Sequence, residues 1–161
     1  MNCVRCAGLS AVMALAAFGG FAGAQTSNPT ASPRIVFVCE HGAAKSVIAT
    51  AYFNKIAAER GLPDRATYRG ANPQAELSVS ALKGLKEDGL TLPTAKPSPI
   101  TTADVTTATH IFAIGCSLPS LATASGKADS WDDVPDHQGY AAQRDAVKRH
   151  VERLIDQLQK R

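Results

Sequence analysis

The chain has 161 residues, of which 45% are hydrophobic and 19% are charged, and its 17 Lys and Arg against 14 Asp and Glu give a formal net charge of +3. This length and composition suit one folded domain with its own core and exclude a disordered, coiled-coil or collagen-like chain. The small net charge, with no run of Lys or Arg interleaved with aromatic residues, argues against a nucleic-acid partner.

The first 33 residues differ from the rest because Arg5 is their one charged side chain. A basic start and an apolar stretch over 7–24 that ends in an A-x-A arrangement are typical of a cleaved export signal. We therefore expect a signal peptide over 1–24, cut near Ala24, and then a flexible Ser-, Thr- and Pro-rich linker over 25–33. An uncleaved membrane anchor is the alternative, but the apolar stretch holds four glycines and is barely long enough to span a bilayer. The mature protein is expected to be periplasmic or secreted and free of the membrane.

From Arg34 onward, apolar strands alternate with amphipathic helices. Apolar runs predict strands over 35–38 and 110–114, and the segments over 66–68 and 128–131 are candidates for two further short strands. Helical spacing and capping residues predict helices over 46–60, 78–88 and 140–160 and a short helix that opens at 101–104. In the helix that Ser78 caps, we expect Val79, Leu82 and Leu85 to face inward. This alternation predicts an α/β domain over 34–161, with a parallel sheet and helices on both faces.

The loop from Cys39 to Lys45, between the first strand and the first helix, carries the residues best suited to chemistry. Backbone N–H groups of such a loop and of the following helix start point to one place, where an anion is stabilised. A thiol held there is favoured as a thiolate and becomes a nucleophile. Gly42 lets the backbone curl, Lys45 supplies a positive charge at the rim, and Ser46 can donate its hydroxyl to the thiolate.

These residues resemble a known family. The segment over 36–46 is similar to the C-x5-R-S loop of low-molecular-weight protein tyrosine phosphatases and the related thioredoxin-coupled arsenate reductases. The segment over 68–73 resembles their S-x-G-x-x-P motif, the helix ending at Gly89 resembles theirs ending in K-E-x-G, and the segment over 131–136 resembles their W-x-x-x-D-P acid loop. The ordered set covers nearly all of 34–161. It implies a flavodoxin-like three-layer fold with a four-stranded parallel sheet.

The resemblance also implies a two-step phosphatase mechanism. Cys39 would attack a phosphate monoester to form a cysteinyl-phosphate, while an Asp protonates the leaving oxygen and then assists the attacking water. By position this acid is Asp136, and Asp133 competes because the spacing from Trp131 is one residue longer than in the family. The oxyanion-binding loop would comprise Glu40, His41, Gly42, Ala43, Ala44 and Ser46.

Two positions depart from the family. Lys45 stands where the family has Arg, so the positive charge is retained while the two parallel hydrogen bonds of a guanidinium are lost. Gly42 stands where the family often has Asn, which suits the backbone and removes a bracing side chain.

Cys116 follows the strand over 110–114 much as Cys39 follows the first strand. The family's strand order makes these strands neighbours, so Cys116 is a candidate redox partner of Cys39. Reductases of this family use a third cysteine, and the segment over 117–131 contains none. We therefore rank a phosphatase first, an arsenate reductase second and a catalytically weakened oxyanion-binding module third.

The remaining residues indicate no further chemistry. The histidines show no paired ligand spacing, so we expect no metal and no cofactor, and His41 is interpreted as a loop-bracing or exposed side chain. The expected partner is a phosphate ester or another oxyanion. The pattern sets neither the natural substrate nor the oligomeric state.

Overall fold

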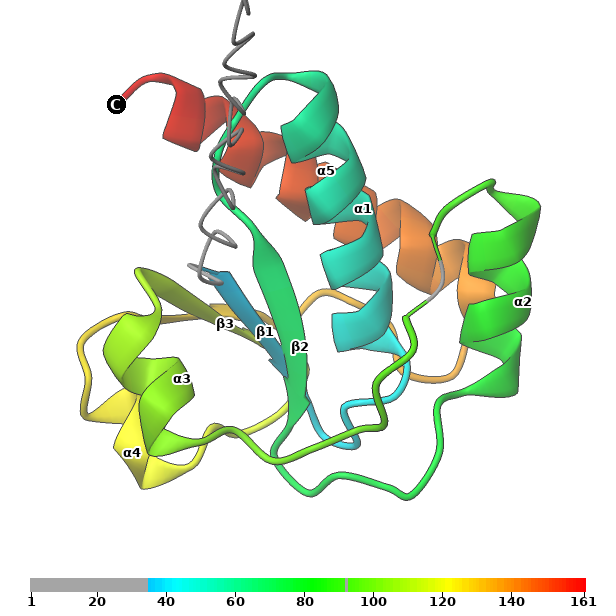
Figure 1. The fold of residues 1–161 in the computed structure, drawn as a ribbon. Coiled ribbons are helices and arrows are strands. Elements are labelled where there is room, and N and C mark those ends of the chain that lie inside the picture. The colour runs from blue at the N-terminus through cyan, green and yellow to red at the C-terminus, as the bar shows by residue number, and fades with distance from the viewer. Residues whose placement is uncertain (1–34, 92) are drawn as a thin grey trace, which may run out of the picture.

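The computed structural model describes residues 35–91 and 93–161, which form three layers (Figure 1). The central layer is a four-stranded parallel sheet in the order β2-β1-β3-β4. Its strands are β1 (Ile35–Cys39), β2 (Ala66–Gly70), β3 (His110–Ile114) and β4 (Ala128–Trp131). The described helices are α1 (Lys45–Glu59), α2 (Val79–Glu87), α3 (Thr102–Thr107), α4 (Ser120–Thr123) and α5 (Gly139–Gln159). The predicted three-layer α/β fold is thereby confirmed, whereas the predicted signal peptide and linker lie outside the described residues.

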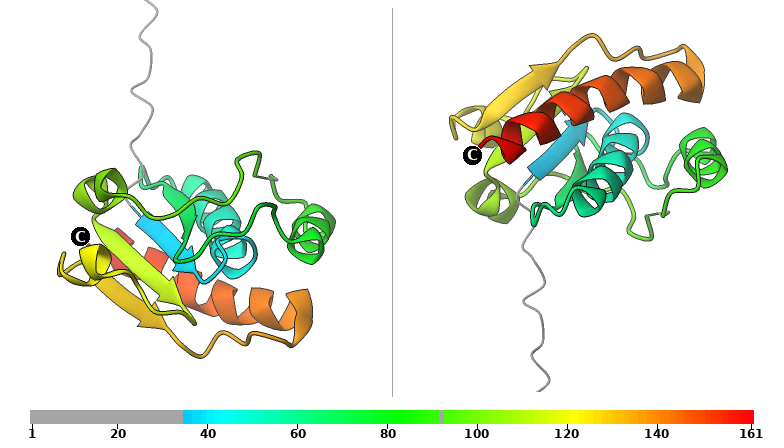
Figure 2. Two further views of the ribbon diagram at one scale, coloured as in Figure 1. Left: turned by 90° about the horizontal axis from the view of Figure 1, so that it is seen from below. Right: turned by 90° about the horizontal axis from the view of Figure 1, so that it is seen from above.

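Strand β1 is buried along its whole length because helices cover both faces of the sheet. Ile35, Phe37 and Cys39 belong to the core shared with α1 and α5, and Val36 and Val38 belong to the core shared with the α3 and α4 side. Figure 2 shows α5 running beside the strands, with α1 next to it. Side chains that alternate between two apolar layers explain why β1 is a continuous hydrophobic run in the sequence.

The strand order creates a crevice at the carboxyl end of β1. From β1 the chain passes to β2 on one side and then returns to build β3 and β4 on the other side. Loops that leave β1 and β3 therefore diverge at their shared edge, which is where ligands bind in sheets of this type. Cys39 ends β1 at this edge, and Gly115 directly follows β3 there.

The predicted elements agree with the structure to within two residues at most ends, and the structure adds α4. Ser78 caps α2, and Thr101 with Asp104 forms the predicted capping box. The prediction that Val79 faces inward is wrong, because this side chain is 81% exposed.

The buried face of α2 is instead formed by Ala81, Gly84 and Leu85. Gly84 carries no hydrophobic signal in the sequence, yet its backbone packs so tightly on Tyr140 that an added Cβ would lie 2.2 Å from the ring. The apolar pattern did not predict this face of α2, because the glycine at the centre of the contact has no side chain to mark it.

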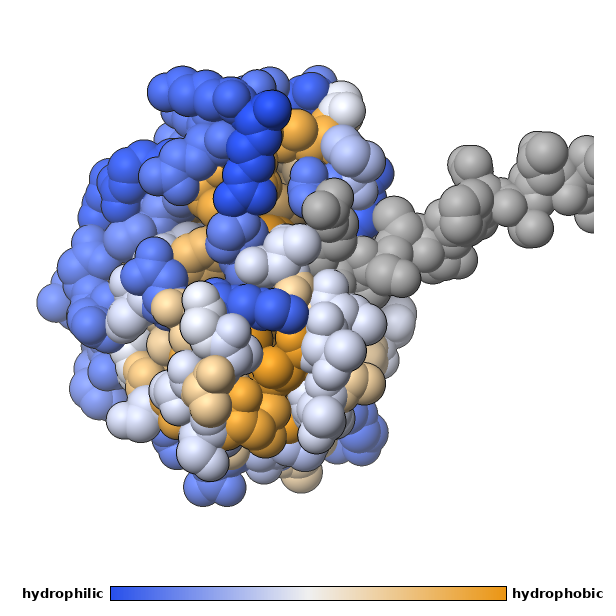
Figure 3. All heavy atoms as spheres, turned by 90° about the vertical axis from the view of Figure 1, so that its left-hand side faces the viewer, coloured by the Kyte–Doolittle hydropathy of each residue, from blue (hydrophilic) through white to orange (hydrophobic). Residues whose placement is uncertain are grey.

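Few large hydrophobic side chains are exposed on the surface of the described residues. Figure 3 shows the face on the α3 and α4 side, where a hydrophobic area in the lower part is surrounded mainly by residues of intermediate hydropathy and the strongly hydrophilic residues lie above it and to the left. Val79 and Leu121 are the large hydrophobic side chains that are exposed among the described residues. Within 35–91 and 93–161, no helix has both the length and the apolar character needed to cross a membrane.

Asp88, just after α2, joins three helices. The hydroxyl groups of Tyr52 on α1 and Tyr140 on α5 donate to its Oδ2 at 2.6 and 2.5 Å, and the Arg144 guanidinium lies 3.5 Å from Oδ1. These donors lower the pKa of Asp88 below its usual value, with the Tyr140 and Tyr52 hydrogen bonds contributing most. Burial, reinforced by the nearby carboxylate, raises the pKa of Tyr52 to about 12.

Replacing this carboxylate should make stability less dependent on pH. Because the pKa of Asp88 is lower in the folded protein than in the unfolded chain, its contribution is present above the unfolded pKa and is lost as pH falls through the folded pKa. We expect Asp88→Asn to lower the melting temperature near pH 7, and we expect the difference from the wild type to shrink as pH falls below the usual carboxyl pKa of 3.8. Thermal unfolding across this range measures the effect, with exposed Asp129→Asn as the control. A melting-temperature difference that stays constant with pH would contradict the assignment.

Candidate active site

The loop after β1 is held in place through its backbone carbonyl groups. The carbonyls of Cys39, Glu40, His41 and Ala43 accept hydrogen bonds from the N–H groups of Ala71, Asn72, Gln74 and Ser78 at 3.0, 2.7, 3.2 and 3.0 Å, respectively. The N–H groups over 40–44 donate to no acceptor within the described part of the chain. The loop therefore directs its carbonyls to the 71–78 segment and keeps its N–H groups available for an anion.

Two glycines allow this loop to lie against β2. Gly42 has a φ of +61°, and a Cβ there would come within 2.7 Å of the backbone nitrogen of Gly70. A Cβ on Gly70 would in turn meet the Gly42 nitrogen at 3.0 Å. The left-handed conformation of Gly42 also explains why the family often has Asn at this position, since Asn is among the few other residues that adopt this conformation readily.

Cys39 lies at the base of the loop and is 3% exposed. Its Sγ is 3.1 Å from the hydroxyl oxygen of Ser46, a fully buried residue in the first turn of α1. The positive end of the α1 dipole and the Ser46 hydroxyl both stabilise negative charge on the sulfur. The strand end and the helix start thus place an activating environment around this thiol.

Lys45 is buried and points across the crevice. Its Nζ donates to the carbonyl oxygen of Gly115 at 3.4 Å and forms an ion pair with Asp136. The hydrogen bond from Lys45 is the largest cause of the lowered pKa of the Asp136 carboxyl. Gly115 was not anticipated from the sequence, although its place directly after β3 is a usable signal. A Cβ there would lie 2.6 Å from Nζ, so a glycine leaves room for the lysine.

The structure separates the two candidate acids. Asp136 lines the same cavity as Cys39, and the side-chain amide of Gln143 donates to its backbone carbonyl at 3.0 Å. Asp133 instead pairs with His150 on α5, whose ring stacks on Trp131 at a centroid distance of 4.6 Å. The geometry therefore favours Asp136 over Asp133 for contact with a bound substrate.

A cavity of about 490 Å³ brings most of the predicted residues together. It is lined by Cys39, Glu40, His41, Ala43, Ala44, Lys45, Gln74, Ser78, Gly115, Asp136, His137 and Gln143. Gly42 and Ser46 support the loop without lining the cavity. A second cavity, of about 750 Å³, lies between α1, β2 and residues 89–95 and contains none of the predicted catalytic side chains.

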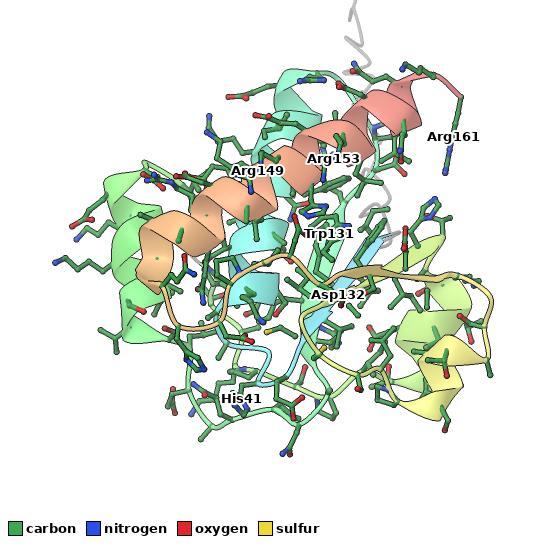
Figure 4. All side chains as sticks on the ribbon, turned by 180° about the vertical axis from the view of Figure 1, so that it is seen from behind. His41, Trp131, Asp132, Arg149, Arg153 and Arg161 are labelled. Atoms are coloured by element: carbon green, nitrogen blue, oxygen red, sulfur yellow. The ribbon has the colours of Figure 1, made fainter. Side chains whose placement is uncertain are left out.

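Among the described residues, Lys45 is the one Lys or Arg that lines the cavity containing Cys39. Figure 4 shows His41 in the loop at one end of the molecule and Arg149, Arg153 and Arg161 along α5 and beyond it. The α5 arginines therefore do not supply the anion site. In the part of the chain that the structure describes, no three His, Cys, Asp or Glu side chains gather in a way that could hold a metal ion.

Cys116 and Cys39 are both free thiols and lie on opposite faces of the sheet. Strands β1 and β3 are neighbours, as the resemblance implied. Cys116, however, packs with Val36 and Val38 on the α3 and α4 side, and its Sγ lies 3.6 Å from the Val38 carbonyl oxygen. Burial raises the pKa of the Cys116 thiol to about 11. The redox partnership stays a prediction, and the folded geometry does not join the two sulfur atoms.

Comparison with known proteins identifies the family to which the chain is similar. Residues 34–118 match the family model described as low molecular weight phosphotyrosine protein phosphatase. A search of curated proteins gives no match.

Solved structures of similar fold include phosphatases and a reductase. A YwlE mutant from Bacillus subtilis is 22% identical, with a TM-score of 0.69, and the match covers 80% of this chain and 99% of that one. A low molecular weight phosphotyrosine phosphatase from Vibrio cholerae O395 is 15% identical, with a TM-score of 0.65 and coverage of 78% and 95%. A thioredoxin-dependent arsenate reductase from Corynebacterium glutamicum is 20% identical, with a TM-score of 0.63 and coverage of 79% and 62%. At these identities the similarity establishes the shared fold.

The two thiols should differ in reactivity. Cys39 lies in the loop whose N–H groups are available for an anion, whereas the pKa of Cys116 is raised to about 11, so little Cys116 thiolate exists at neutral pH. We expect iodoacetamide near pH 7 to modify Cys39 first and inorganic phosphate to slow that reaction. Mass spectrometry of the modified peptides measures both rates, and Cys39→Ser is the control. Faster modification of Cys116, or no protection by phosphate, would contradict this arrangement.

Proposed function

The chain belongs to the low molecular weight phosphotyrosine protein phosphatase family, and on this premise we propose that it is a cysteine-dependent phosphatase that hydrolyses phosphate monoesters. Family membership supports an enzyme that is either a cysteine-based phosphatase or an arsenate reductase. The observation that carries the narrower proposal is the meeting of Cys39, the free N–H groups of its loop and Asp136 in one cavity. This set supplies a nucleophile, an oxyanion site and an acid, which are the parts that phosphoryl transfer to a thiol requires.

In the first step, the Cys39 thiolate attacks the phosphorus atom, and the bond between phosphorus and the ester oxygen breaks. The loop N–H groups hold the non-bridging oxygens. The protonated Asp136 carboxyl gives its proton to the departing oxygen, so the alcohol leaves neutral. The products of this step are the alcohol, a cysteinyl-phosphate and the Asp136 carboxylate.

In the second step, water attacks the phosphorus atom of the cysteinyl-phosphate. The Asp136 carboxylate takes a proton from this water, and the bond between sulfur and phosphorus breaks. Inorganic phosphate leaves, and both the Cys39 thiolate and the protonated acid are restored. The Ser46 hydroxyl, 3.1 Å from Sγ, stabilises the thiolate as the leaving group.

Lys45 connects substrate binding to the protonation of the acid. In the free protein its ammonium group pairs with Asp136 and lowers the pKa of that carboxyl, which favours the charged form. An arriving phosphate competes for the same ammonium group, and its negative charge raises the pKa of Asp136 again. Substrate binding thereby prepares the carboxyl to act as an acid.

The same site supports an arsenate reductase less well than a phosphatase. A reductase needs a second thiol that attacks the Cys39 adduct, and Cys116 packs on the opposite face of the sheet from Cys39. Its raised pKa further lowers the amount of attacking thiolate. These observations support the phosphatase.

We also propose that residues 1–24 act as an export signal, so that the mature protein is periplasmic or secreted. The support is the sequence pattern of Arg5, the apolar stretch and the A-x-A arrangement. In an oxidising compartment the two remaining thiols are not routinely reset by cytosolic reductants, which also favours a hydrolase over a reductase.

Hydrolysis of p-nitrophenyl phosphate by the mature chain tests the function. We expect turnover by the wild type, no turnover by Cys39→Ser, and a loss of roughly 100-fold in kcat for Asp136→Asn. Asp133→Asn is the matched control, because the same change in charge occurs outside the cavity, and it should leave kcat within about twofold. Phosphate binding without turnover would instead indicate an oxyanion-binding module, and equal losses for the two Asp variants would refute the role of Asp136.

Removal of the lysine charge should affect both rate and titration. Lys45→Met keeps the length of the side chain but cannot hold an oxyanion, so we expect kcat/KM to fall by roughly 100-fold. The pKa of Asp136 should rise toward its ordinary value, because the lysine hydrogen bond that lowers it is gone. Steady-state kinetics and NMR titration of the carboxyl measure these changes, with exposed Lys86→Met as the control. An unchanged Asp136 titration would contradict the ion pair.

A further inference from the structure

The walls of the cavity above Cys39 are polar. Beyond the loop backbone they carry the side chains of Glu40, His41, Gln74, His137 and Gln143, while the apolar contribution comes from the small Ala43 and Ala44. No Phe, Tyr or Trp side chain lines this cavity in the described structure. A substrate's leaving group therefore meets carboxylate, amide and imidazole groups instead of a hydrophobic slot.

The aromatic side chains of the described residues are engaged elsewhere. Trp131 is 5% exposed and packs between Phe37, Phe112 and the ring of His150. The three Phe side chains in the described ranges are in the core. The hydroxyl groups of Tyr52 and Tyr140 bind Asp88, and that of Tyr68 donates to the Ala95 carbonyl. No Phe, Tyr or Trp ring thus lines the cavity in which an aryl group bound at Cys39 would lie.

The polar wall offers hydrogen-bond acceptors to a ligand. Glu40 is exposed and takes part in no hydrogen bond or ion pair within the described structure. The Gln74 side-chain nitrogen donates to the Glu76 carbonyl at 2.6 Å, which leaves its oxygen as an acceptor. Hydroxyl groups on a substrate can donate to both acceptors. An aryl ring would cover them without offering a donor and would gain no stacking contact with a Phe, Tyr or Trp ring in return.

We infer that the substrate is a small, non-aromatic phosphate monoester whose leaving group carries hydroxyl groups, as in a polyol phosphate, and that Glu40 and Gln74 recognise those hydroxyls. This inference rests on the proposed phosphatase function and narrows its substrate class. It excludes an aryl phosphate such as phosphotyrosine as the preferred substrate, because an aryl group would leave the acceptors of Glu40 and Gln74 without hydrogen-bond donors.

Binding to a chain that cannot turn over tests this preference without interference from the reactivity of the leaving group. Calorimetry on Cys39→Ser compares inorganic phosphate, glycerol 3-phosphate and phenyl phosphate. We expect glycerol 3-phosphate to bind roughly fivefold more tightly than phenyl phosphate. The same order should appear when the two esters inhibit wild-type turnover of p-nitrophenyl phosphate. Equal or tighter binding of phenyl phosphate would overturn the inference while leaving the phosphatase intact.

A neutral substitution in the wall isolates the recognition of hydroxyl groups. Gln74→Leu, introduced into Cys39→Ser, should abolish the preference for glycerol 3-phosphate and leave inorganic phosphate binding within about twofold. Gln157→Leu is the matched control, because it makes the same change on an exposed glutamine of α5 that is outside this cavity. A preference that survives in Gln74→Leu would refute the role of this residue. Failure of all three ligands to bind, with no turnover by the wild type, would instead reject the proposed function and this inference with it.

Discussion

The exchange of hydrogen bonds between the loop after β1 and the 71–78 segment is the contact on which the rest of the site depends. Four loop carbonyls accept from that segment, and this leaves the loop N–H groups for an anion. The close approach of Gly42 to Gly70 is possible because neither residue has a side chain. Fixed dipoles of this kind need no reorganisation when charge develops on the substrate, which is why a rigid backbone serves catalysis well.

The charge balance in the cavity follows from one buried lysine. Lys45 reaches both the Gly115 carbonyl and Asp136, so in the free site its charge is already balanced by that carboxylate. An arginine there would offer two parallel hydrogen bonds to an oxyanion, whereas an ammonium group acts as a point charge. In the proposed mechanism, the loop N–H groups and Lys45 together hold the oxyanion, and Lys45 also links the arrival of phosphate to the protonation of Asp136.

The two cysteines show how strand geometry decides redox chemistry. Cys39 ends a strand whose odd-numbered side chains face α1 and α5, and Cys116 packs on the other face after β3. Neighbouring strand ends bring the backbones close, and the pleat alone would place Cys116, two residues after Ile114, on the same face as Cys39. The chain instead turns at Gly115, whose φ is +55°, and Cys116 packs on the other face. From the sequence, the two positions at the ends of adjacent strands suggested a redox pair, because the spacing of residues does not reveal which face a side chain beyond the strand end will occupy.

The sequence by itself determined the alternation of strands and helices, the parallel sheet, and the loop from Cys39 to Lys45 as the place of chemistry, because apolar periodicity, capping residues and glycines act locally. Position in the sequence favoured Asp136 as the acid and left Asp133 as a competitor. Only the tertiary structure decided that Asp136 lines the same cavity as Cys39 while Asp133 pairs with His150, that Lys45 pairs with Asp136, and that the cavity walls are polar. These contacts join residues far apart in the chain. Their outcome depends on how α5 and the loop after β4 pack against the sheet, which no local pattern encodes.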